Sequence, residues 1–199
     1  MRGHGRINTD LAEILVFWRN TETRFGAAAM TLHWLVFALV VGMVALGWTM
    51  VPLPLGVQKL RLYDWHKSIG IVVFSLMAAR LLWRLWNPPP PLPVHMKPWE
   101  RRLARISHIS LYAVLFAMPL SGWIMSSAAN FPVSAFGLFV LPDLVKPDKA
   151  LLETMKIFHR FASYGLFALL AIHAAGAAKH HFVDKDDVLK RMLPGRIVR

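Results

Sequence analysis

The sequence contains no cysteine among its 199 residues. This absence excludes disulfide bonds, thiolate zinc sites, cysteine-ligated iron–sulfur clusters and the CxxCH attachment of c-type haem. Histidine is present in nine copies. It is therefore the residue type that has to supply most of the ligands of any bound metal or cofactor.

Acidic residues are also scarce, because Asp and Glu number 11 against 23 Lys and Arg, and the formal net charge is +12. A basic chain can bind nucleic acid, since clustered cations neutralise phosphates. Here, however, the basic residues flank long apolar stretches and form no continuous stripe, as is typical of the inner surface of a membrane. We therefore expect a lipid bilayer as the partner, and no nucleic acid.

Apolar residues are in excess, at 56% of the chain, compared with about 45–50% in soluble domains. A helix needs about 20 mostly apolar residues to cross the hydrocarbon core of a membrane. Four stretches are long enough, and we expect spans near 27–51, 66–86, 107–129 and 157–178. The sequence therefore predicts an all-α fold, an integral membrane four-helix bundle.

The segments outside the spans are marked by proline and charge. The motif PPPPLP at 88–93 cannot continue a helix, so the second span must end before it. The loop over 130–156 contains the apolar run FPVSAFGLFVLP, which we expect to lie on the membrane surface, because proline and glycine interrupt it. We divide the chain into an N-terminal cytoplasmic extension at 1–26 without the form of a signal peptide, a four-span domain at 27–178 and a basic cytoplasmic tail at 179–199.

The distribution of Lys and Arg predicts the orientation of the bundle. The side that carries both termini holds sixteen of these residues, and the opposite side holds seven. Cytoplasmic segments carry the excess of Lys and Arg in membrane proteins. Both the N and C termini are therefore expected in the cytoplasm.

Four of the histidines lie inside the apolar spans, at His33, His66, His159 and His173. Any one of them alone is explained equally well by packing between helices. His159 and His173, however, are fourteen residues apart, which separates them by roughly 21 Å along one helix and returns them to within about 40° of the same face. His33 shares the inner depth with His173, and His66 shares the outer depth with His159.

Two pairs of imidazoles at two depths are what two stacked haems require. Each iron takes one imidazole from each of two facing helices, and the porphyrin lies between them. We predict that His33 and His173 bind one haem iron and that His66 and His159 bind the other. With both axial positions filled, the iron has no open site for oxygen, so the expected chemistry is electron transfer.

Cationic side chains near each level are expected to contact the haem propionates through charge-assisted hydrogen bonds. They are Arg80 and Arg84 at the inner level and Lys67 and Arg160 at the outer level. The alternative for each of them is that its long side chain only extends toward the membrane surface.

A fifth histidine, His108, begins the third span at the inner level. It is a rival ligand to His33 or His173. We favour a position for it near a quinone or a propionate, because the third span has no second histidine to serve the outer level.

The sequence resembles the bacterial cytochrome b561 family over residues 24–194. The resemblance rests on TLHWLVF around His33, WHKSIGIVVFSLMAARLLWRL around His66, HISLYAVLFAMPLSGW in the third span, and HRFASYGLFALLAIHAAGAAKHHFVDKDDVLKRMLP through His159 and His173. The last stretch is the most specific, because it combines the fourteen-residue histidine pair with the closing KHHF and LKRMLP.

The resemblance implies two b-type haems held by His33 with His173 and by His66 with His159, in a multi-pass protein of the bacterial inner membrane. Members of the family include a superoxide oxidase that passes electrons from periplasmic superoxide to ubiquinone. The sequence departs from the family in its leading 26 residues and in Lys67, which introduces a charge beside an outer ligand.

We consider three functions. The first is a superoxide:ubiquinone oxidoreductase, since the seven basic residues of the outer side would raise the local concentration of the superoxide anion. The second is an electron-transfer subunit or partner that carries electrons between quinone and another redox protein, such as a periplasmic one. The third is a histidine-lined metal transporter without haem, against which the scarcity of Asp and Glu inside the spans argues.

Overall fold

The computed structural model describes residues 17–194, and long helices make up most of this part of the chain. The elements are α2 (Ala27–Met50), α3 (Val57–Trp86), α4 (Pro98–Ala128), a hairpin of β1 (Ser134–Ala135) and β2 (Phe139–Val140), α5 (Lys149–Phe182) and a short 3₁₀ helix η1 (Lys190–Met192). Each of the four α-helices is long and apolar enough to cross a membrane. The predicted four-helix membrane bundle is confirmed.

Three of the helices, α3, α4 and α5, begin about two turns before the spans expected from hydropathy. Helix α4 begins at Pro98. Proline is favoured in the first turn of a helix, because the N–H that it lacks would have no partner within the helix. Helix α5 begins at Lys149, where the Leu151 N–H donates to Asp148 Oδ1 at 2.9 Å. Hydropathy marks only the part of a helix that lies in lipid, whereas capping residues determine where the helix begins.

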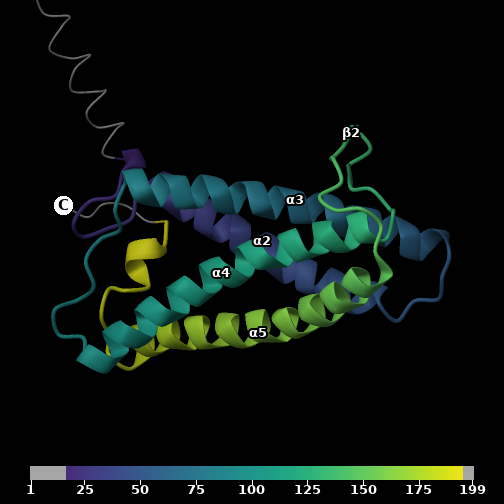
Figure 1. Ribbon diagram of the computed structural model, residues 1–199. Helices are drawn as coiled ribbons and strands as arrows, with labels where there is room; N and C mark the ends of the chain where they lie inside the picture. Colours follow the sequence, from purple (N-terminus) through teal and green to yellow (C-terminus); the bar gives the residue numbers. More distant parts are fainter. Residues whose placement is uncertain (1–16, 195–199) are drawn as a thin grey trace, which may run out of the picture.

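The four helices lie side by side along one long axis, as Figure 1 shows. Helix α2 packs on α3, α3 contacts α4, and α4 packs closely on α5, whereas the backbone of α5 makes few close approaches to α2 or α3. Residues 17–26 and 183–194 lie at the same end of the bundle, which we call the tail end. The opposite end, which carries β1 and β2, is called the hairpin end.

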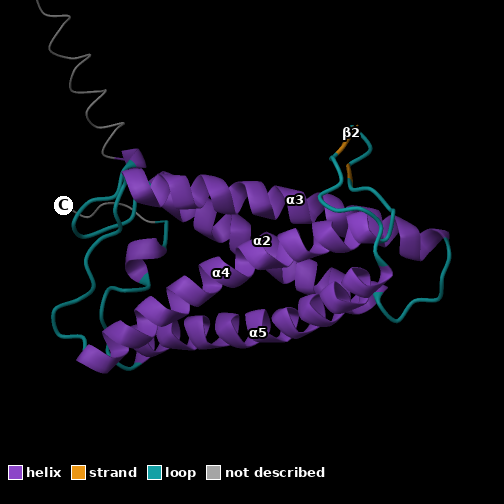
Figure 2. Cartoon of the chain, viewed as in Figure 1, coloured by secondary structure: helices purple, strands orange, loops and turns teal. Residues whose placement is uncertain are grey.

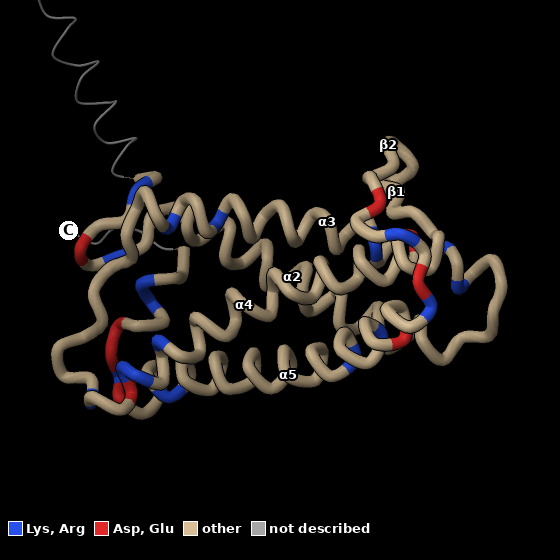
Figure 3. Tube along the Cα trace, in the orientation of Figure 1, with Lys and Arg blue, Asp and Glu red and all other residues tan. Residues whose placement is uncertain are grey.

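Charged residues lie mainly at the two ends of the bundle. Figure 3 shows Lys, Arg, Asp and Glu gathered at the tail end and at the hairpin end, with the middle of the helices almost free of them. A lipid environment disfavours charged side chains at its centre. The central region of the bundle is therefore the part suited to the hydrocarbon core.

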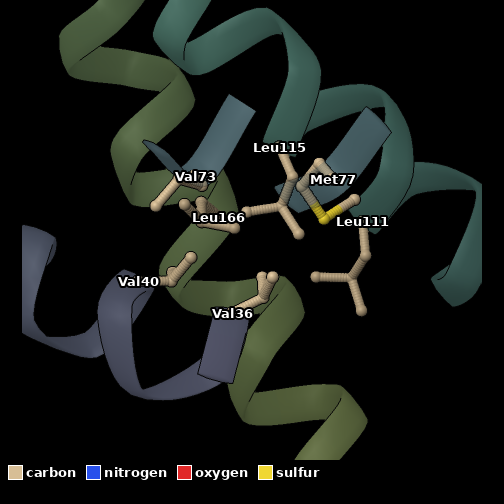
Figure 4. Packing of buried hydrophobic residues seen from close by; sticks show 7 residues of the cluster. All are labelled: Val36, Val40, Val73, Met77, Leu111, Leu115 and Leu166. Atoms are coloured by element: carbon tan, nitrogen blue, oxygen red, sulfur yellow. The ribbon is translucent and has the colours of Figure 1, made fainter. Parts of the chain in front are cut away.

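Seven buried apolar side chains form the core in the middle of the bundle (Figure 4). They come from all four helices and are Val36, Val40, Val73, Met77, Leu111, Leu115 and Leu166. In lipid, close packing of such side chains contributes more to helix association than removal of apolar surface from water. Leu166 follows His159 by seven residues and precedes His173 by seven, so the core lies between the two histidine levels.

The loop before α5 contains the antiparallel hairpin, which was not predicted. Figure 2 shows it standing out from the bundle beside α3. Ser68 on α3 holds its base, because the Ser68 hydroxyl donates to the Ser134 carbonyl and the Phe136 N–H donates to Ser68 Oγ, both at 2.9 Å. Phe139 and Val140 on its second strand are exposed. The expected contact of this apolar run with the membrane surface stays a prediction.

Part of the expected N-terminal extension is packed against the rest of the tail end. The Asn20 side-chain amide donates to the Asn87 carbonyl at 2.9 Å, and the Arg24 guanidinium donates to the Leu193 carbonyl at 2.7 Å. Residues 17–26 therefore connect the α3–α4 linker to the tail. Residues 1–16 lie outside the described part of the chain.

Candidate metal centres between facing histidines

The level nearer the hairpin end contains one pair of imidazoles. The ring centroids of His66 on α3 and His159 on α5 lie 6.4 Å apart, with an angle of 67° between the ring planes. Both residues are half-buried. The structure thus brings together the two residues that the sequence assigned to the outer level.

Ser121 on α4 determines which nitrogen of His159 carries the proton. The Ser121 hydroxyl donates to the Met118 carbonyl at 2.8 Å, so its single hydrogen is used there. The 2.8 Å contact between Ser121 Oγ and His159 Nδ1 is then a hydrogen bond donated by Nδ1–H. The neutral imidazole therefore keeps a lone pair on Nε2, the form that binds a metal.

Two glycines lie beside the same imidazoles. A Cβ atom at Gly47 would lie 3.7 Å from His66 Cε1, and one at Gly122 would lie 3.6 Å from His159 Cε1. These are ordinary contact distances, but any longer side chain at either position would extend into the space beside the ring. The two glycines therefore keep that space open to a flat group.

The level nearer the tail end contains three imidazoles. The ring centroids of His33 on α2 and His173 on α5 lie 6.1 Å apart. His108 on α4 approaches His173 more closely, with a centroid separation of 5.3 Å. All three are half-buried, so the structure places the predicted pair and its rival at the same level.

The two wider separations fit a metal held between two opposite imidazoles. Two metal–nitrogen bonds of about 2 Å and two ring radii of about 1 Å put the centroids about 6 Å apart. The 5.3 Å separation of His108 from His173 is shorter than this geometry requires. Because the donors are imidazole nitrogens, the His66–His159 and His33–His173 pairs fit the haem iron that the resemblance implies.

Two of these imidazoles lack a hydrogen-bond partner on the ring nitrogen nearer the backbone. His33 Nδ1 and His66 Nδ1 are both buried and unpaired within the described part of the chain. A buried polar atom without a partner costs about 1–3 kcal/mol. A metal-binding imidazole usually donates its other ring N–H to a partner, so these two rings lack the kind of hydrogen bond that His159 makes with Ser121.

The cations expected at the inner level lie together near the His33 level. The guanidinium groups of Arg80 and Arg84 lie 5.7 and 5.8 Å from the ring centroid of Tyr112. All three residues line a small cavity that also reaches Asn20 and Met192 of the tail end. This cluster gives the inner level a positive charge and an opening toward the tail.

The cations expected at the outer level are arranged differently. Lys67 Nζ donates to the Pro132 carbonyl at 3.1 Å, lies 3.5 Å from Asp64 Oδ1 and sits 3.8 Å above the ring centroid of Phe131. Its ammonium group thus already contacts the loop that leads to the hairpin, through Pro132 and Phe131. Arg160 is exposed, one residue after His159.

Three residues at these levels were not predicted from the sequence, namely Ser121, Tyr112 and Ser68. Ser121 lies 38 residues before His159, and Ser68 lies 66 residues before Ser134. A polar residue within an apolar span was the available signal, because such a residue normally has a partner in the bundle interior. The sequence alone does not indicate which partner that is.

Comparison with known proteins gives a consistent result. The family model described as prokaryotic cytochrome b561 matches residues 24–195. Cytochrome b561 homolog 2 of Escherichia coli (strain K12) is 40% identical to this chain over 183 residues, which cover 87% of this chain and 93% of the relative. The probable superoxide oxidase CybB of Yersinia pestis is 29% identical over 175 residues, and Cytochrome b561 homolog 1 of Escherichia coli (strain K12) is 31% identical over 179 residues. The first of these two alignments covers 86% of this chain and 96% of the relative, and the second covers 87% and 98%.

Proposed function

Because the chain belongs to the prokaryotic cytochrome b561 family, and is therefore a multi-pass bacterial membrane protein and a b-type cytochrome that transfers electrons, we propose that it binds two b haems. One haem lies at each histidine level. His66 and His159 are the axial ligands of the outer haem, and His33 and His173 are those of the inner haem.

The observation that carries this proposal is the pair of matched imidazole separations, 6.4 Å at the outer level and 6.1 Å at the inner level. His159 and His173 belong to the same helix, fourteen residues apart, so the two levels are separated by roughly 21 Å along α5. A single haem would leave one of these pairs without a function.

The remaining site residues have supporting roles in this proposal. Arg80 and Arg84 bind the propionates of the inner haem, in line with their position beside Tyr112. Arg160 is the propionate contact at the outer level, and Lys67 reaches a propionate only if its ammonium leaves Asp64 and Pro132. Each of these contacts is a charge-assisted hydrogen bond.

The inner level also contains the acceptor site in this proposal. His108, the third imidazole there, lies beside His173 and contacts the quinone or a propionate of the inner haem. The electron acceptor is ubiquinone, which the membrane itself supplies.

The direction of electron transfer follows from the proposed orientation. With the tail end in the cytoplasm and the hairpin end in the periplasm, the protein resides in the bacterial inner membrane and residues 27–178 form its electron-carrying domain. Two superoxide anions would each give up one electron at the outer level and leave as oxygen. One ubiquinone takes these two electrons and two protons and leaves as ubiquinol. The basic residues of the hairpin end attract the anionic donor.

An alternative donor is another redox protein, which makes the chain an electron-transfer partner rather than an oxidase. The exposed apolar hairpin at the donor end favours this alternative, because it offers a surface that a protein can contact. Superoxide added to the purified, oxidised protein distinguishes the two. Rapid reduction of the haems, followed by reoxidation on addition of ubiquinone, supports the oxidase, whereas unchanged oxidised haem spectra contradict it.

The haem content is the first test of the proposal as a whole. The pyridine haemochrome spectrum of the purified protein, divided by its protein concentration, is expected to give two b haems per chain. A value of one haem per chain contradicts the two-level arrangement. A protein that carries no haem but transports a metal would support the transporter alternative instead.

A further inference from the structure

A second group of metal-binding residue types lies at the tail end, outside both histidine levels. His180, Asp184 and Asp186 bring one ligand atom each to within 4.8 Å of one another. His180 Nδ1 lies 2.7 Å from Asp186 Oδ2 and 3.1 Å from Asp184 Oδ2. His95, from the linker between α3 and α4, adds its Nε2 atom at 3.3 Å from Asp186 Oδ2. We call these four residues the tail-end site.

Within this group, the Asp186 carboxylate has no permanently charged partner. The Asp186 side chain is only 7% exposed, and within residues 17–194 no Lys or Arg nitrogen lies within 4.0 Å of its carboxylate. Its ionic partners are the imidazoles of His95 and His180, which are charged only when protonated. A buried carboxylate without a permanent cation is costly.

Three hydrogen-bonding groups surround the Asp186 carboxylate. The Val188 N–H donates to Asp186 Oδ1 at 3.0 Å, and His180 Nδ1 and His95 Nε2 lie 2.7 and 3.3 Å from Asp186 Oδ2. These contacts hold the two ring nitrogens against one carboxylate oxygen. A cation bound between them would balance the carboxylate charge directly.

We propose that the tail-end site binds a divalent first-row cation of the zinc type. The ligands are His180 Nδ1, one oxygen each of Asp184 and Asp186, and His95 Nε2. Two imidazoles and two carboxylates are a donor set that zinc accepts, and four protein ligands make a closed, structural site. Ligand atoms held at about 2.0–2.1 Å in a tetrahedron lie about 3.3 Å from one another. The separations of 3.1 and 3.3 Å match this value, and the 2.7 Å hydrogen bond between His180 Nδ1 and Asp186 Oδ2 would lengthen when a metal replaces its proton.

Lys179 is the competing partner of the site. Its Nζ lies 2.6 Å from Asp184 Oδ2 and 2.9 Å from Glu100 Oε1. Because Glu100 remains available to it, Lys179 keeps an ion pair when Asp184 turns to the metal. The competition weakens the site without blocking it, since an ion pair exposed to solvent is weak.

A cation at this position would join parts of the chain that are distant in sequence. His95 precedes α4, whereas the other three ligands lie at or just beyond the end of α5. His180 follows His173 by seven residues, or roughly 10.5 Å along the helix axis. The metal would therefore hold the α3–α4 linker against the end of α5, the helix that carries one proposed ligand of each haem.

The test uses the full-length, haem-loaded protein in detergent. The protein is treated with a chelator, dialysed against zinc chloride over a range of concentrations and assayed for zinc by mass spectrometry. We expect about one zinc per chain in addition to the haem iron, and a 10–100-fold weaker affinity in Asp186→Asn and His180→Ala. Asp187→Asn is the matched control, because it removes the same charge from the neighbouring residue, whose side chain is 67% exposed. Wild-type affinity is expected in this control.

His95→Ala makes the test independent of folding defects at the buried positions. The His95 side chain is 60% exposed, so its removal leaves the packing intact, and zinc binding is expected to weaken by about tenfold. Absence of zinc uptake by the wild type, or equal losses in Asp186→Asn and Asp187→Asn, would overturn the proposal. The haem spectrum recorded on the same samples reports separately on the proposed function, since the site contains none of the haem ligands.

Discussion

The two histidine levels have similar ring separations and different surroundings. At the outer level, two imidazoles face each other and Ser121 fixes the proton on His159 Nδ1. At the inner level, His108 adds a third imidazole, and two guanidinium groups lie close by. The outer level therefore offers a metal a single arrangement, whereas the inner level offers a choice of ligand and an additional positive charge.

The largest expected effect is loss of the outer haem. His66→Ala and His159→Ala each remove one of only two ligands at that level, so the haem content is expected to fall from two to about one per chain. Asp187→Asn, which changes a residue whose side chain is 67% exposed and belongs to neither proposed site, serves as the control and is expected to keep both haems. The pyridine haemochrome assay measures the result, and two haems in either outer variant would contradict the outer pairing.

Substitution at the inner level tests whether the third imidazole can act as a ligand. His33→Ala is expected to lose the inner haem, whereas His108→Ala keeps both, because the 6.1 Å separation fits an iron centre better than the 5.3 Å separation. The haem content of the two single variants and of the double variant is measured. If His33→Ala retains two haems and the double variant retains one, His108 replaces His33 as the inner ligand. That result would contradict the assignment of His108 to a quinone or propionate contact.

Removal of one positive charge at the inner level is expected to change only the inner haem. Arg80→Gln lowers the reduction potential of the inner haem by roughly 50 mV, because a nearby cation favours the reduced, less positive form of the iron. Potentiometric titration followed by optical spectroscopy measures both haems in one experiment. The outer haem is the internal control, and equal shifts of both potentials would show that Arg80 acts through the fold rather than through local charge.

The smallest expected effect concerns Ser121 at the outer level. Ser121→Ala removes the acceptor for His159 Nδ1–H, which makes the ligand less basic and raises the potential of the outer haem by about 20–40 mV. Ser121→Thr keeps the hydroxyl and is expected to restore the wild-type value. A shift of the same size in both variants would mean that helix packing, and not this hydrogen bond, determines the potential.

Hydropathy and helical periodicity predicted the features that repeat along the chain. The four spans follow from the length of the apolar runs, and the common face of His159 and His173 follows from their spacing. The pairing across helices was predicted because a helix that crosses a membrane gives each residue a depth, and depth is shared between helices.

Features that depend on contacts between distant residues were not predicted. The Ser121 bond to His159 spans 38 residues, and the contact of His95 with Asp186 spans 91. The hairpin was also missed, since its strands have only two residues each and its hold on the bundle comes from Ser68 of another helix. No periodic pattern in the sequence encodes which surfaces meet in such cases.

Helix α5 carries its important residues at equal intervals of seven. His159, Leu166, His173 and His180 follow one another along one side of the helix, and Leu166 and His180 are its two buried residues. A single inserted or deleted residue between any two of them would turn everything beyond it by about 100°. Over evolutionary time, helix α5 can thus accept substitutions between these four positions but almost no change in the length that separates them.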